Sequence, residues 1–525
     1  MTATALLDLV PTDLRRRWAD LGLYPDHDLY DLFSVQVFLH PDRLAVVDDE
    51  GVITYAGLNA LALRYAAALR ACGVDAGDVV ATQLANSRHA CAVDLAVAAL
   101  GGVVLPFPVG RGAREARSLI GRSRAVAAVV EPAAVPGIRG LELPTLHHVL
   151  TPDDLATAEA SAVTPVRSDP DGPARILVSS GSESEPKMVL YSHNALLGGR
   201  GAFVGRLIPA GEELRALFLV PLASSFGSNG TTVTLARHGG TVVAQAKFTP
   251  EATLDLVERA RPTHLFGVPT MFRMLLDHPR LATTDTSSIR VIAPGGARLD
   301  AVTAAACREA FDCVVVNVYG SADGVNCHTA LDDPPERATG AGRPNPAVAE
   351  IRIVDDALDP VPDGQVGEIV ARGPMTPMRY LGDDTLNERH RTPDGWVRTG
   401  DLGVLDADGY LDVVGRRKDI VIRGGDNISP VEVEQLLVGH PAVRDAACVG
   451  VPDELMGERL CACLVLVEGT TVTVEDLGTF LGAAGLARYK HPERLLVLEE
   501  LPLSPAGKID KDALRRRIGV GLGLG

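Results

Sequence analysis

Residues 179–189 read Ser-Ser-Gly-Ser-Glu-Ser-Glu-Pro-Lys-Met-Val and follow the short apolar run 175–178, which is typical of a β-strand. A loop rich in Ser and Gly that ends in Pro-Lys after a strand is suited to a chain of phosphates. Its backbone N–H groups and hydroxyls can point inward, and its lysine adds positive charge. Here, however, Glu183 and Glu185 place two carboxylates in the loop. The stretch therefore predicts a phosphate site with an unusual, repulsive component.

Four further segments accompany this loop along the chain. They are Asn317-Val318-Tyr319-Gly320-Ser321-Ala322-Asp323, Arg398-Thr399-Gly400-Asp401-Leu402, 415–419 leading into 428–434, and 502–508. In order, spacing and content the five segments resemble the AMP-forming adenylating superfamily, which holds the acyl-CoA ligases, the adenylation domains of peptide synthetases and luciferase. The resemblance extends from about Leu29 to Arg517.

The loop 179–189 is also similar to that of ligase-like enzymes of bacterial secondary metabolism, including the diterpenoid acyl-CoA ligases of platensimycin-type pathways. The superfamily resemblance implies a two-step reaction. A carboxylate first attacks the α-phosphate of ATP, which gives an acyl-adenylate and pyrophosphate. A thiol, usually that of coenzyme A, then displaces AMP.

Composition narrows the class of protein. A chain of 525 residues predicts two or more domains, and its net charge of −17 argues against nucleic acid or an anionic membrane as the partner. The eight cysteines are scattered, and the pair Cys461 and Cys463 fits a strand buried on both faces, so neither a zinc site nor a disulfide framework is predicted. Together with an N-terminus unlike a signal peptide, this predicts a cytoplasmic protein.

Helical and strand-like apolar segments alternate along the first part of the chain. Helices are expected at Thr54–Cys72 and Ala90–Leu100, the latter buried rather than membrane-spanning because Asp94 interrupts it. The expected strands are Val79–Leu84, Val103–Phe107, Val126–Val130, Ile176–Val178, Leu217–Val220, Thr241–Val243, Val291–Ala293 and Val314–Val318. This pattern predicts an α/β fold of layered, largely buried sheets.

The pattern changes toward the C-terminus. Short strands and turns over 351–371 predict a small β subdomain, and apolar strands recur beyond a polar connector near residue 415. We therefore expect a large N-terminal domain over 1–415, a hinge at 416–418 and a small α+β C-terminal domain over 419–525. The resemblance implies that this C-terminal domain is mobile and rotates about Lys418 between the two reaction steps.

The resemblance also implies which residues hold the nucleotide. Tyr319 corresponds to the tyrosine whose ring packs on adenine, and an aromatic face suits a base. Asp401 corresponds to the carboxylate that accepts both ribose hydroxyls, and Arg416 to the arginine that also holds the ribose. Further nucleotide contacts are expected at Ser180, Ser182, Gly295, Gly296, Ala297, Asn317, Val318, Gly320 and Ser321.

Two lysines are the candidate catalytic residues. Lys187 ends the phosphate loop, and Lys508 resembles the lysine that binds the carboxylate and α-phosphate oxygens during adenylation. In the second step, the C-terminal domain is implied to present the Gly424-Gly425 segment to the pantetheine arm of coenzyme A. Backbone must approach backbone in such a tunnel, which glycine permits.

The chain departs from the family pattern around the phosphates. Glu183 stands where the family has a hydroxyl, and Ser184 stands where a glycine lets the loop wrap. Ala322 replaces a threonine that bonds the α-phosphate. Asp323, the candidate Mg²⁺ ligand, is one methylene shorter than the family's glutamate.

These departures weaken the triphosphate pocket more than the nucleoside pocket. A carboxylate about 5 Å from a phosphate charge costs roughly 3 kcal/mol at an effective dielectric constant of about 20. A lost hydrogen bond to a charged group costs about 1.5–3 kcal/mol more. The residues expected to read adenosine need neither the β- nor the γ-phosphate.

The acyl pocket is expected at Ser224, Ser225, Phe226, Gly227 and Gly320. An amino-acid substrate would need a buried carboxylate opposite its ammonium group, and the segment 221–227 contains none. Its small side chains predict instead a roomy, neutral pocket for a bulky, cyclic or aromatic carboxylic acid.

Three functions remain open from the sequence. The first is an acyl-CoA ligase that makes its own adenylate from ATP with Mg²⁺, its loop glutamates turned outward. The second is an enzyme that takes an acyl-adenylate preformed by a partner adenylating enzyme and mainly makes the thioester. The third is a non-catalytic sensor of an acyl-adenylate or nucleotide. The thiol is that of coenzyme A or of a carrier protein, and the sequence leaves a homodimer open.

Overall fold

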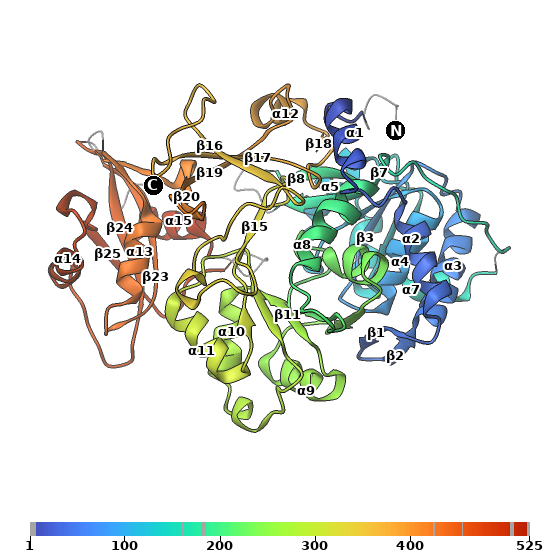
Figure 1. Cartoon of the computed structure of the whole chain (residues 1–525), viewed down its shortest axis with the longest axis horizontal. Helices are drawn as coiled ribbons and strands as arrows, with labels where there is room; N and C mark the ends of the chain where they lie inside the picture. Colours follow the sequence, from blue (N-terminus) through green and yellow to red (C-terminus); the bar gives the residue numbers. More distant parts are fainter. Residues whose placement is uncertain are drawn as a thin grey trace. The chain divides into compact units, whose positions relative to one another are not determined.

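The computed structural model describes residues 7–159, 161–179, 185–423, 426–453, 455–503 and 509–521. The chain divides into two compact units, coloured along the sequence in Figure 1. Unit 1 comprises residues 1–351 and 370–399, and unit 2 comprises residues 352–369 and 400–525. The predicted hinge at 416–418 thus lies inside unit 2, and its movement stays a prediction.

Unit 1 contains two seven-stranded sheets, with strand orders β13-β12-β11-β9-β10-β1-β2 and β18-β8-β7-β4-β3-β5-β6. The first comprises β1 (Leu44–Asp48), β2 (Gly51–Thr54), β9 (Arg215–Phe218), β10 (Thr241–Ala244), β11 (His264–Gly267), β12 (Val291–Pro294) and β13 (Val314–Val315). The second comprises β3 (Val79–Gln83), β4 (Val103–Pro106), β5 (Ala127–Val130), β6 (His148–Leu150), β7 (Pro173–Ser179), β8 (Lys187–Ser192) and β18 (Arg379–Leu381). The interior strands of both sheets are parallel, except β8, which is antiparallel to β7 and β18; this confirms the predicted layered α/β class.

Most helices of unit 1 lie in the connections between these strands, whereas α1 and α2 precede β1 and α12 follows β18. They are α1 (Thr12–Asp20), α2 (Leu29–Leu39), α3 (Tyr55–Ala71), α4 (Arg88–Ala99), α5 (Ala113–Ser123), α6 (Val135–Arg139), α7 (Pro152–Thr157), α8 (Gly201–Gly205), α9 (Pro250–Ala260), α10 (Pro269–Leu276), α11 (Ala301–Phe311), α12 (Asp384–His390) and the π-helices η3 (Ala195–Arg200) and η4 (Gly230–Arg237). The predicted buried helix is α4, whose side chains from Cys91 to Ala99 are all buried. Within the described residues, no helix is long and apolar enough to cross a membrane.

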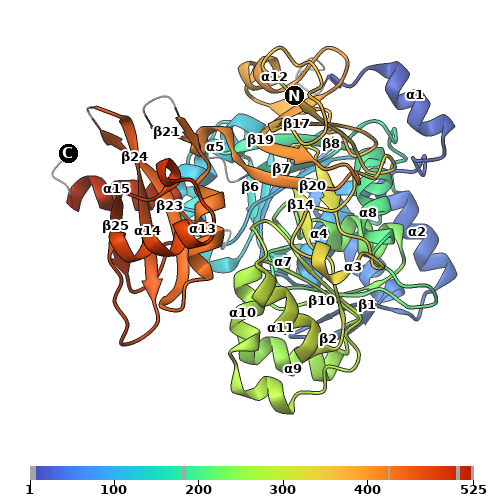
Figure 2. The same ribbon diagram turned by 60° about the vertical axis from the view of Figure 1, so that its left-hand side comes forward.

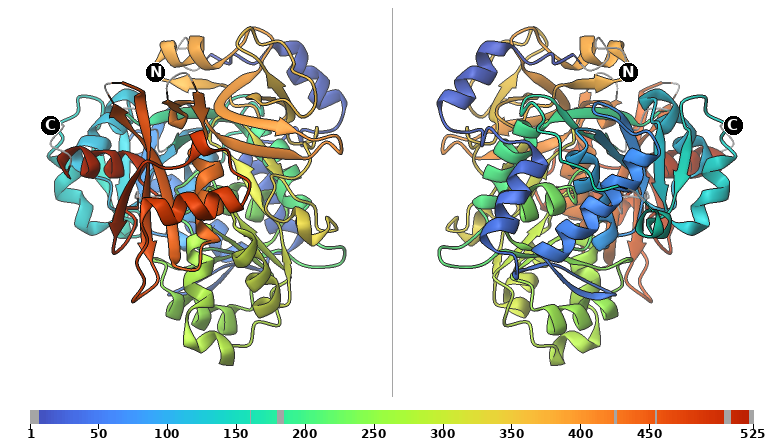
Figure 3. Two further views of the ribbon diagram at one scale, coloured as in Figure 1. Left: turned by 90° about the vertical axis from the view of Figure 1, so that its left-hand side faces the viewer. Right: turned by 90° about the vertical axis from the view of Figure 1, so that its right-hand side faces the viewer.

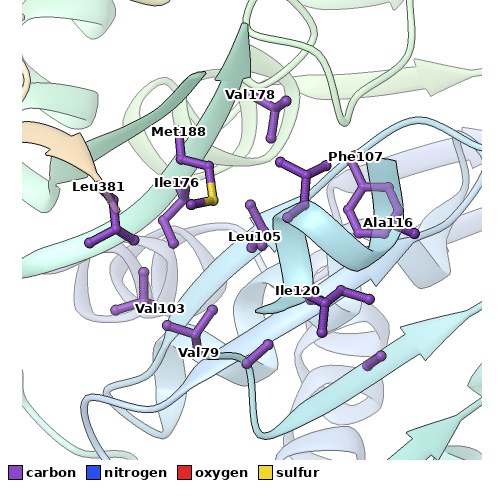
Figure 4. Packing of buried hydrophobic residues seen from close by; sticks show 14 of the residues in the cluster. Val79, Val103, Leu105, Phe107, Ala116, Ile120, Ile176, Val178, Met188 and Leu381 are labelled. Atoms are coloured by element: carbon purple, nitrogen blue, oxygen red, sulfur yellow. The ribbon is translucent and has the colours of Figure 1, made fainter. Parts of the chain in front are cut away.

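The second sheet packs one of its faces against α5 (Figure 4). Val79, Val103 and Ile176 come from the neighbouring strands β3, β4 and β7, and Ile120 comes from α5; each is at most 1% exposed. Because both faces of such a parallel sheet are covered, its strands read as continuous apolar runs rather than as alternating ones. This is the property by which they could be found in the sequence.

A buried arginine of the second sheet forms an ion pair with α4 and also bonds the loop that follows β9 of the first sheet. Nη1 of Arg175 on β7 lies 2.5 Å from Oδ2 of Asp94 on α4. Nη2 of the same arginine donates to the Leu222 carbonyl over 3.2 Å. Asn86, at the start of α4, holds the same loop: its amide donates to the Val220 carbonyl over 3.0 Å. The loop after β9 is thus fixed by polar side chains of the other sheet.

Unit 2 contains a five-stranded sheet with helices on both of its faces (Figures 2 and 3). Its strands are β21 (Val421–Arg423), β22 (Asp426–Ile428), β23 (Val443–Asp453), β24 (Gly457–Leu466) and β25 (Arg494–Leu498), and its helices are α13 (Pro430–Val438), α14 (Val474–Ala483) and α15 (Lys511–Gly521). Alternate residues of β23 and β24 pack against α13 and α14 on one face and against α15 on the other. Cys461 and Cys463 are buried on the α15 face, which confirms the predicted doubly covered strand.

The predicted β subdomain is a four-stranded sheet of order β16-β17-β19-β20. Its strands are β16 (Glu350–Val354), β17 (Gly367–Arg372), β19 (Val397–Leu405) and β20 (Leu411–Arg416). The chain passes from one unit to the other within β16, β17 and β19.

One predicted strand, Val314–Val318, is wrong as a single element. The structure breaks it into β13, which joins the first sheet, and β14 (Val318–Gly320), which pairs with β15 (Asn326–His328). The break occurs at Asn317, whose amide nitrogen donates to the carbonyls of Thr339 and Gly340 over 3.1 and 2.8 Å.

All eight cysteines are free. Burial raises the pKa of the Cys91 and Cys307 thiols to about 12. The pKa of Cys313 is likewise raised to about 12, first by burial. These thiols are therefore protonated throughout the neutral pH range.

The buried ion pair yields a stability prediction. Asp94→Ala leaves Arg175 charged and without its carboxylate at 1% exposure, so the free energy of unfolding should fall by about 3–5 kcal/mol. Chemical denaturation followed by circular dichroism measures the loss. As a control, Asp75→Ala removes the exposed partner of Arg70 and should cost less than about 1 kcal/mol. Equal losses in the two variants would contradict the prediction.

Candidate functional site

The loops predicted to border the acyl and nucleotide pockets meet at Gly295. This glycine follows β12 and forms a parallel bridge with Val318 on β14. A Cβ at this position would lie 3.2 Å from the Val318 carbonyl oxygen and 3.3 Å from Cε1 of Phe226. Phe226 and β14 therefore contact the same glycine, and a larger residue would have to displace one of them. Gly296, with φ +78°, and Ala297 follow in exposed positions.

Tyr319 lies half-buried in the hairpin of β14 and β15. A tight turn follows it: the N–H of Ser321 donates to the Val325 carbonyl over 3.1 Å, and the Ser321 hydroxyl accepts the N–H of Asp323 over 3.1 Å. Gly320 is exposed, and a Cβ there would lie 3.0 Å from the Val325 carbonyl oxygen. The turn thus brings the predicted adenine residue and the predicted metal ligand into one small motif.

Asn317 is buried, and its amide nitrogen is already used in the fold. Its Oδ1 is also buried, but this oxygen has no hydrogen-bond partner among the described residues and can still accept one. The contact of Asn317 with a nucleotide stays a prediction, and the structure restricts it to this oxygen.

A buried arginine that sequence reasoning missed holds the predicted acyl loop. Arg200 ends the π-helix η3 and is 5% exposed. Its Nη1 donates to the Ser225 carbonyl over 2.8 Å and to the Ser228 hydroxyl over 3.1 Å, and its Nη2 donates to the Ser225 hydroxyl over 3.1 Å. The guanidinium also lies 5.0 Å from the ring centre of Tyr191. The segment 221–227 contains no charged residue, but the charged guanidinium of Arg200 bonds it.

The acyl loop has an apolar side as well. The ring of Phe226 meets that of Phe266 edge-on at 5.8 Å, and Phe266 stacks on Phe218 at 4.8 Å. Ser224 accepts the Gly227 N–H over 3.0 Å, and a Cβ on Gly227 would come within 2.0 Å of a backbone oxygen. An aromatic wall beside two small hydroxyl residues suits a flat or cyclic acyl group better than a charged one.

Lys187, the predicted phosphate lysine, has a partner that the sequence did not reveal. Its Nζ lies 3.3 Å from Nε2 of His390, at the end of α12, and 5.6 Å from the ring centre of Tyr380. The other ring nitrogen, Nδ1, is 3.2 Å from the Arg398 carbonyl. A neutral His390 that donates from Nδ1 leaves Nε2 as an acceptor for the ammonium group. The recorded contacts of Lys187 are thus with an imidazole and an aromatic ring rather than with a carboxylate.

One of the two loop glutamates, Glu185, contacts the neighbouring helix α5. Oε2 of Glu185 accepts a hydrogen bond from the Ser118 hydroxyl and lies 4.0 Å from Nη1 of Arg122. Both partners belong to α5, so this carboxylate is neutralised on the helix. Of the two predicted repulsive charges, Glu185 therefore does not need to face a bound triphosphate.

The residues present fit a single-carboxylate magnesium site. Oδ1 of Asp323 is buried and has no hydrogen-bond partner among the described residues. Burial, and next to it the charge of Asp323, raises the pKa of Tyr380 well above its ordinary value. Mg²⁺ is commonly held by one or two carboxylates, substrate phosphates and waters. A bound Mg²⁺ would neutralise phosphate charge at this oxygen.

The two residues predicted to read the ribose come together within unit 2. Asp401 on β19 and Arg416 on β20 are cross-strand neighbours, and Nε of Arg416 lies 3.2 Å from Oδ1 of Asp401. Asp401 is buried, whereas Arg416 is about half-exposed. Lys418 follows in an exposed single turn, 417–419. Five predicted residues lie outside the described part of the chain: Ser180, Ser182, Gly424, Gly425 and Lys508.

Comparisons with known proteins bear on this arrangement. The AMP-binding enzyme family matches residues 33–381, and the AMP-binding enzyme C-terminal domain matches residues 432–508. Triostin synthetase I of Streptomyces triostinicus is 35% identical, covering 97% of each chain. The 2-hydroxy-7-methoxy-5-methyl-1-naphthoate–CoA ligase of Streptomyces carzinostaticus is 34% identical, over 97% of this chain and 96% of that one. The structure of an amide bond synthetase from Marinactinospora thermotolerans matches with TM-score 0.83 and 32% identity, over 93% of this chain and 99% of that one.

The contact between Lys187 and His390 is open to a direct test. His390→Leu removes the acceptor, so the Kd for ATP should rise about tenfold or more, as expected for a lost hydrogen bond to a charged group. The Kd for AMP should change little, because Lys187 is expected to contact the outer phosphates. Calorimetry with both nucleotides measures the difference. Glu388→Gln, an exposed change on the same helix, is the control, and a loss that affects AMP and ATP equally would refute the assignment.

Proposed function

The chain belongs to the AMP-binding enzyme family, and from this premise we propose that it joins a bulky, cyclic or aromatic carboxylic acid to a thiol through an acyl-adenylate. Adenylate-forming ligases of acyl and aryl acids are the relatives found in this family. Three points go beyond membership of the family and are proposed: the class of acid, the thiol acceptor and the relative rates of the two steps.

The observation that carries the proposal is the contact of Phe226 and Val318 with Gly295. An acyl-adenylate has its acyl group and its adenosine on opposite sides of one phosphate. Phe226 belongs to the predicted acyl loop, and Val318 precedes the predicted adenine residue. A single glycine between the two surfaces lets such a molecule run from one pocket to the other past bare backbone.

The lining supports an aromatic or cyclic acid. Phe226 meets Phe266 edge-on and Phe266 stacks on Phe218, and no carboxylate occurs in the loop 221–227 to bind an amino acid's ammonium group. The naphthoate–CoA ligase among the relatives acts on an acid of this kind.

The acceptor is proposed to be a thiol, with coenzyme A ahead of a carrier protein. The Gly424-Gly425 segment, which the resemblance aligns with the pantetheine path, supports this choice. The amide bond synthetase among the structural relatives shows what the alternative would be. An amine in place of the thiol would give an amide from the same adenylate.

We further propose that adenylation from ATP is weakened relative to thioester formation. Ala322 is buried, and its carbonyl accepts the Tyr191 hydroxyl over 2.9 Å, so it offers no side-chain donor to an α-phosphate. Glu183 adds a charge to the loop. Glu185 contributes little to this effect because Ser118 and Arg122 bind it. The weakening is therefore expected to be smaller than two loop carboxylates would imply.

A pair of assays tests the proposed reaction. In the first, a panel of aromatic and cyclic acids is mixed with ATP, Mg²⁺ and coenzyme A; in the second, the synthetic acyl-adenylate replaces acid and ATP. Mass spectrometry of the thioester should show a faster second reaction, since the adenosine contacts are kept and the triphosphate contacts are reduced. Equal rates in the two assays would contradict the proposal that adenylation is weakened. Absence of thioester from both assays would contradict the proposal that a thiol is the acceptor.

Lys508 separates the two half-reactions. Lys508→Ala should reduce the reaction from ATP by about a hundredfold or more, because the lysine stabilises charge that develops between carboxylate and α-phosphate. The reaction from supplied acyl-adenylate should keep its rate.

A variant that restores the family's residues around the phosphates tests the same step by a gain of activity. Glu183→Thr with Ser184→Gly and Ala322→Thr should raise the ATP-dependent rate only while Lys508 is intact. No gain in this triple variant would show that these residues do not limit adenylation. A Lys508→Ala enzyme that still adenylates at the wild-type rate would remove the lysine from the mechanism.

A further inference from the structure

A pocket of about 380 Å³ lies in unit 1, away from the residues discussed so far. Four arginines line it: Arg215, Arg259, Arg261 and Arg290. They come from the start of β9, the end of α9 and the residue before β12, and α9 is at the bottom of the view in Figure 1. Because β9, β11 and β12 are parallel, the pocket lies at their N-terminal edge, whereas Gly295 lies at the C-terminal edge.

Two of the four arginines have carboxylate partners. Arg261 lies 2.7 Å from Asp285, which also receives a hydrogen bond from the backbone of Ser287. Arg290 lies 3.1 Å from Glu212. Two further acidic residues lie near them in the chain: Glu258 accepts the Asp285 N–H and lies 3.8 Å from Arg280, and the Glu213 side chain lies 4.0 Å from Arg43.

The other two arginines carry uncompensated charge. Arg215 donates from Nη2 to the Ala260 carbonyl, while its buried Nε has no hydrogen-bond partner within the described residues. Arg259 is exposed and makes no hydrogen bond or ion pair with any described residue. Two net positive charges thus share one small cavity in a chain whose net charge is −17. Like charges held together in this way favour the binding of an anion.

We propose that this pocket binds a phosphate dianion, either free or as the end group of a small phosphate ester. The planar guanidinium fork matches phosphate oxygens in pairs, which makes arginine the preferred residue for this anion. The remaining lining residues, Ala260, Thr263 and Ser288, are small. They offer no aromatic face on which a base could stack, so the phosphate itself is the group recognised. The proposal rests on the charges of unit 1 alone and does not depend on the reaction proposed above.

Calorimetry of the full chain tests the site with two probes that lack adenosine, inorganic phosphate and glycerol 3-phosphate. Arg259→Ser is the central variant, because Arg259 makes no bond that the fold would lose. It should raise the Kd of the bound probe about tenfold or more, since a charge-assisted contact to phosphate is lost. Arg16→Ser removes the same charge from an exposed position on α1 and should leave the Kd unchanged.

The probes distinguish the source of the phosphate. Comparable affinity for both supports an ester as ligand, and binding of inorganic phosphate alone supports the free anion. Tyr319→Ala, which alters the proposed adenine contact, should not affect either probe, so that failure of the nucleotide assignment would not be mistaken for failure here. Binding that is equal in wild type and Arg259→Ser overturns the proposal. Arg259-dependent binding of hexaglutamate without either phosphate also overturns it, in favour of an acidic peptide.

Discussion

The pairing of Asp94 with Arg175 is the interaction on which the arrangement of unit 1 depends. Two opposite charges are removed from water between α4 and β7, and the cost of burying such a pair falls when its remaining hydrogen-bonding groups are also satisfied. Arg175 meets part of this requirement through the Leu222 carbonyl. The need to satisfy a buried cation thereby draws a loop of one sheet onto a strand of the other.

A second buried cation also bonds the predicted acyl loop. Arg200 bonds Ser225 and Ser228, while Arg175 bonds Leu222 a few residues earlier. Both arginines come from elements of the second sheet's half of unit 1, and both act on backbone or hydroxyl oxygens. The course of the loop is therefore held by fixed donors that lie outside the loop.

Local pattern was enough to predict most of the fold. Doubly covered strands such as β3, β4 and β24 are continuous apolar runs, and period and composition identify these directly. The same reasoning wrongly predicted one continuous strand over Val314–Val318. The break at Asn317 involves the carbonyls of Thr339 and Gly340, which are distant in the sequence. For the candidate site, short motifs predicted roles for Tyr319, Asp401 and Arg416, and these roles stay predictions. Arg200 and His390 belong to no recognisable motif. Arg200 contacts a residue 25 positions away in the sequence, and His390 contacts one 203 positions away.

The burial of the cysteines has a consequence for a protein that is proposed to hold an activated acyl group. An acyl-adenylate is an electrophile that any nearby thiolate would capture. In Cys91, Cys307 and Cys313 burial keeps the sulfur protonated, and Cys91 and Cys307 are at most 1% exposed. The chain's own thiols at these positions thus cannot compete with the external acceptor. A protein with free cysteines can in this way avoid being acylated by its own intermediate.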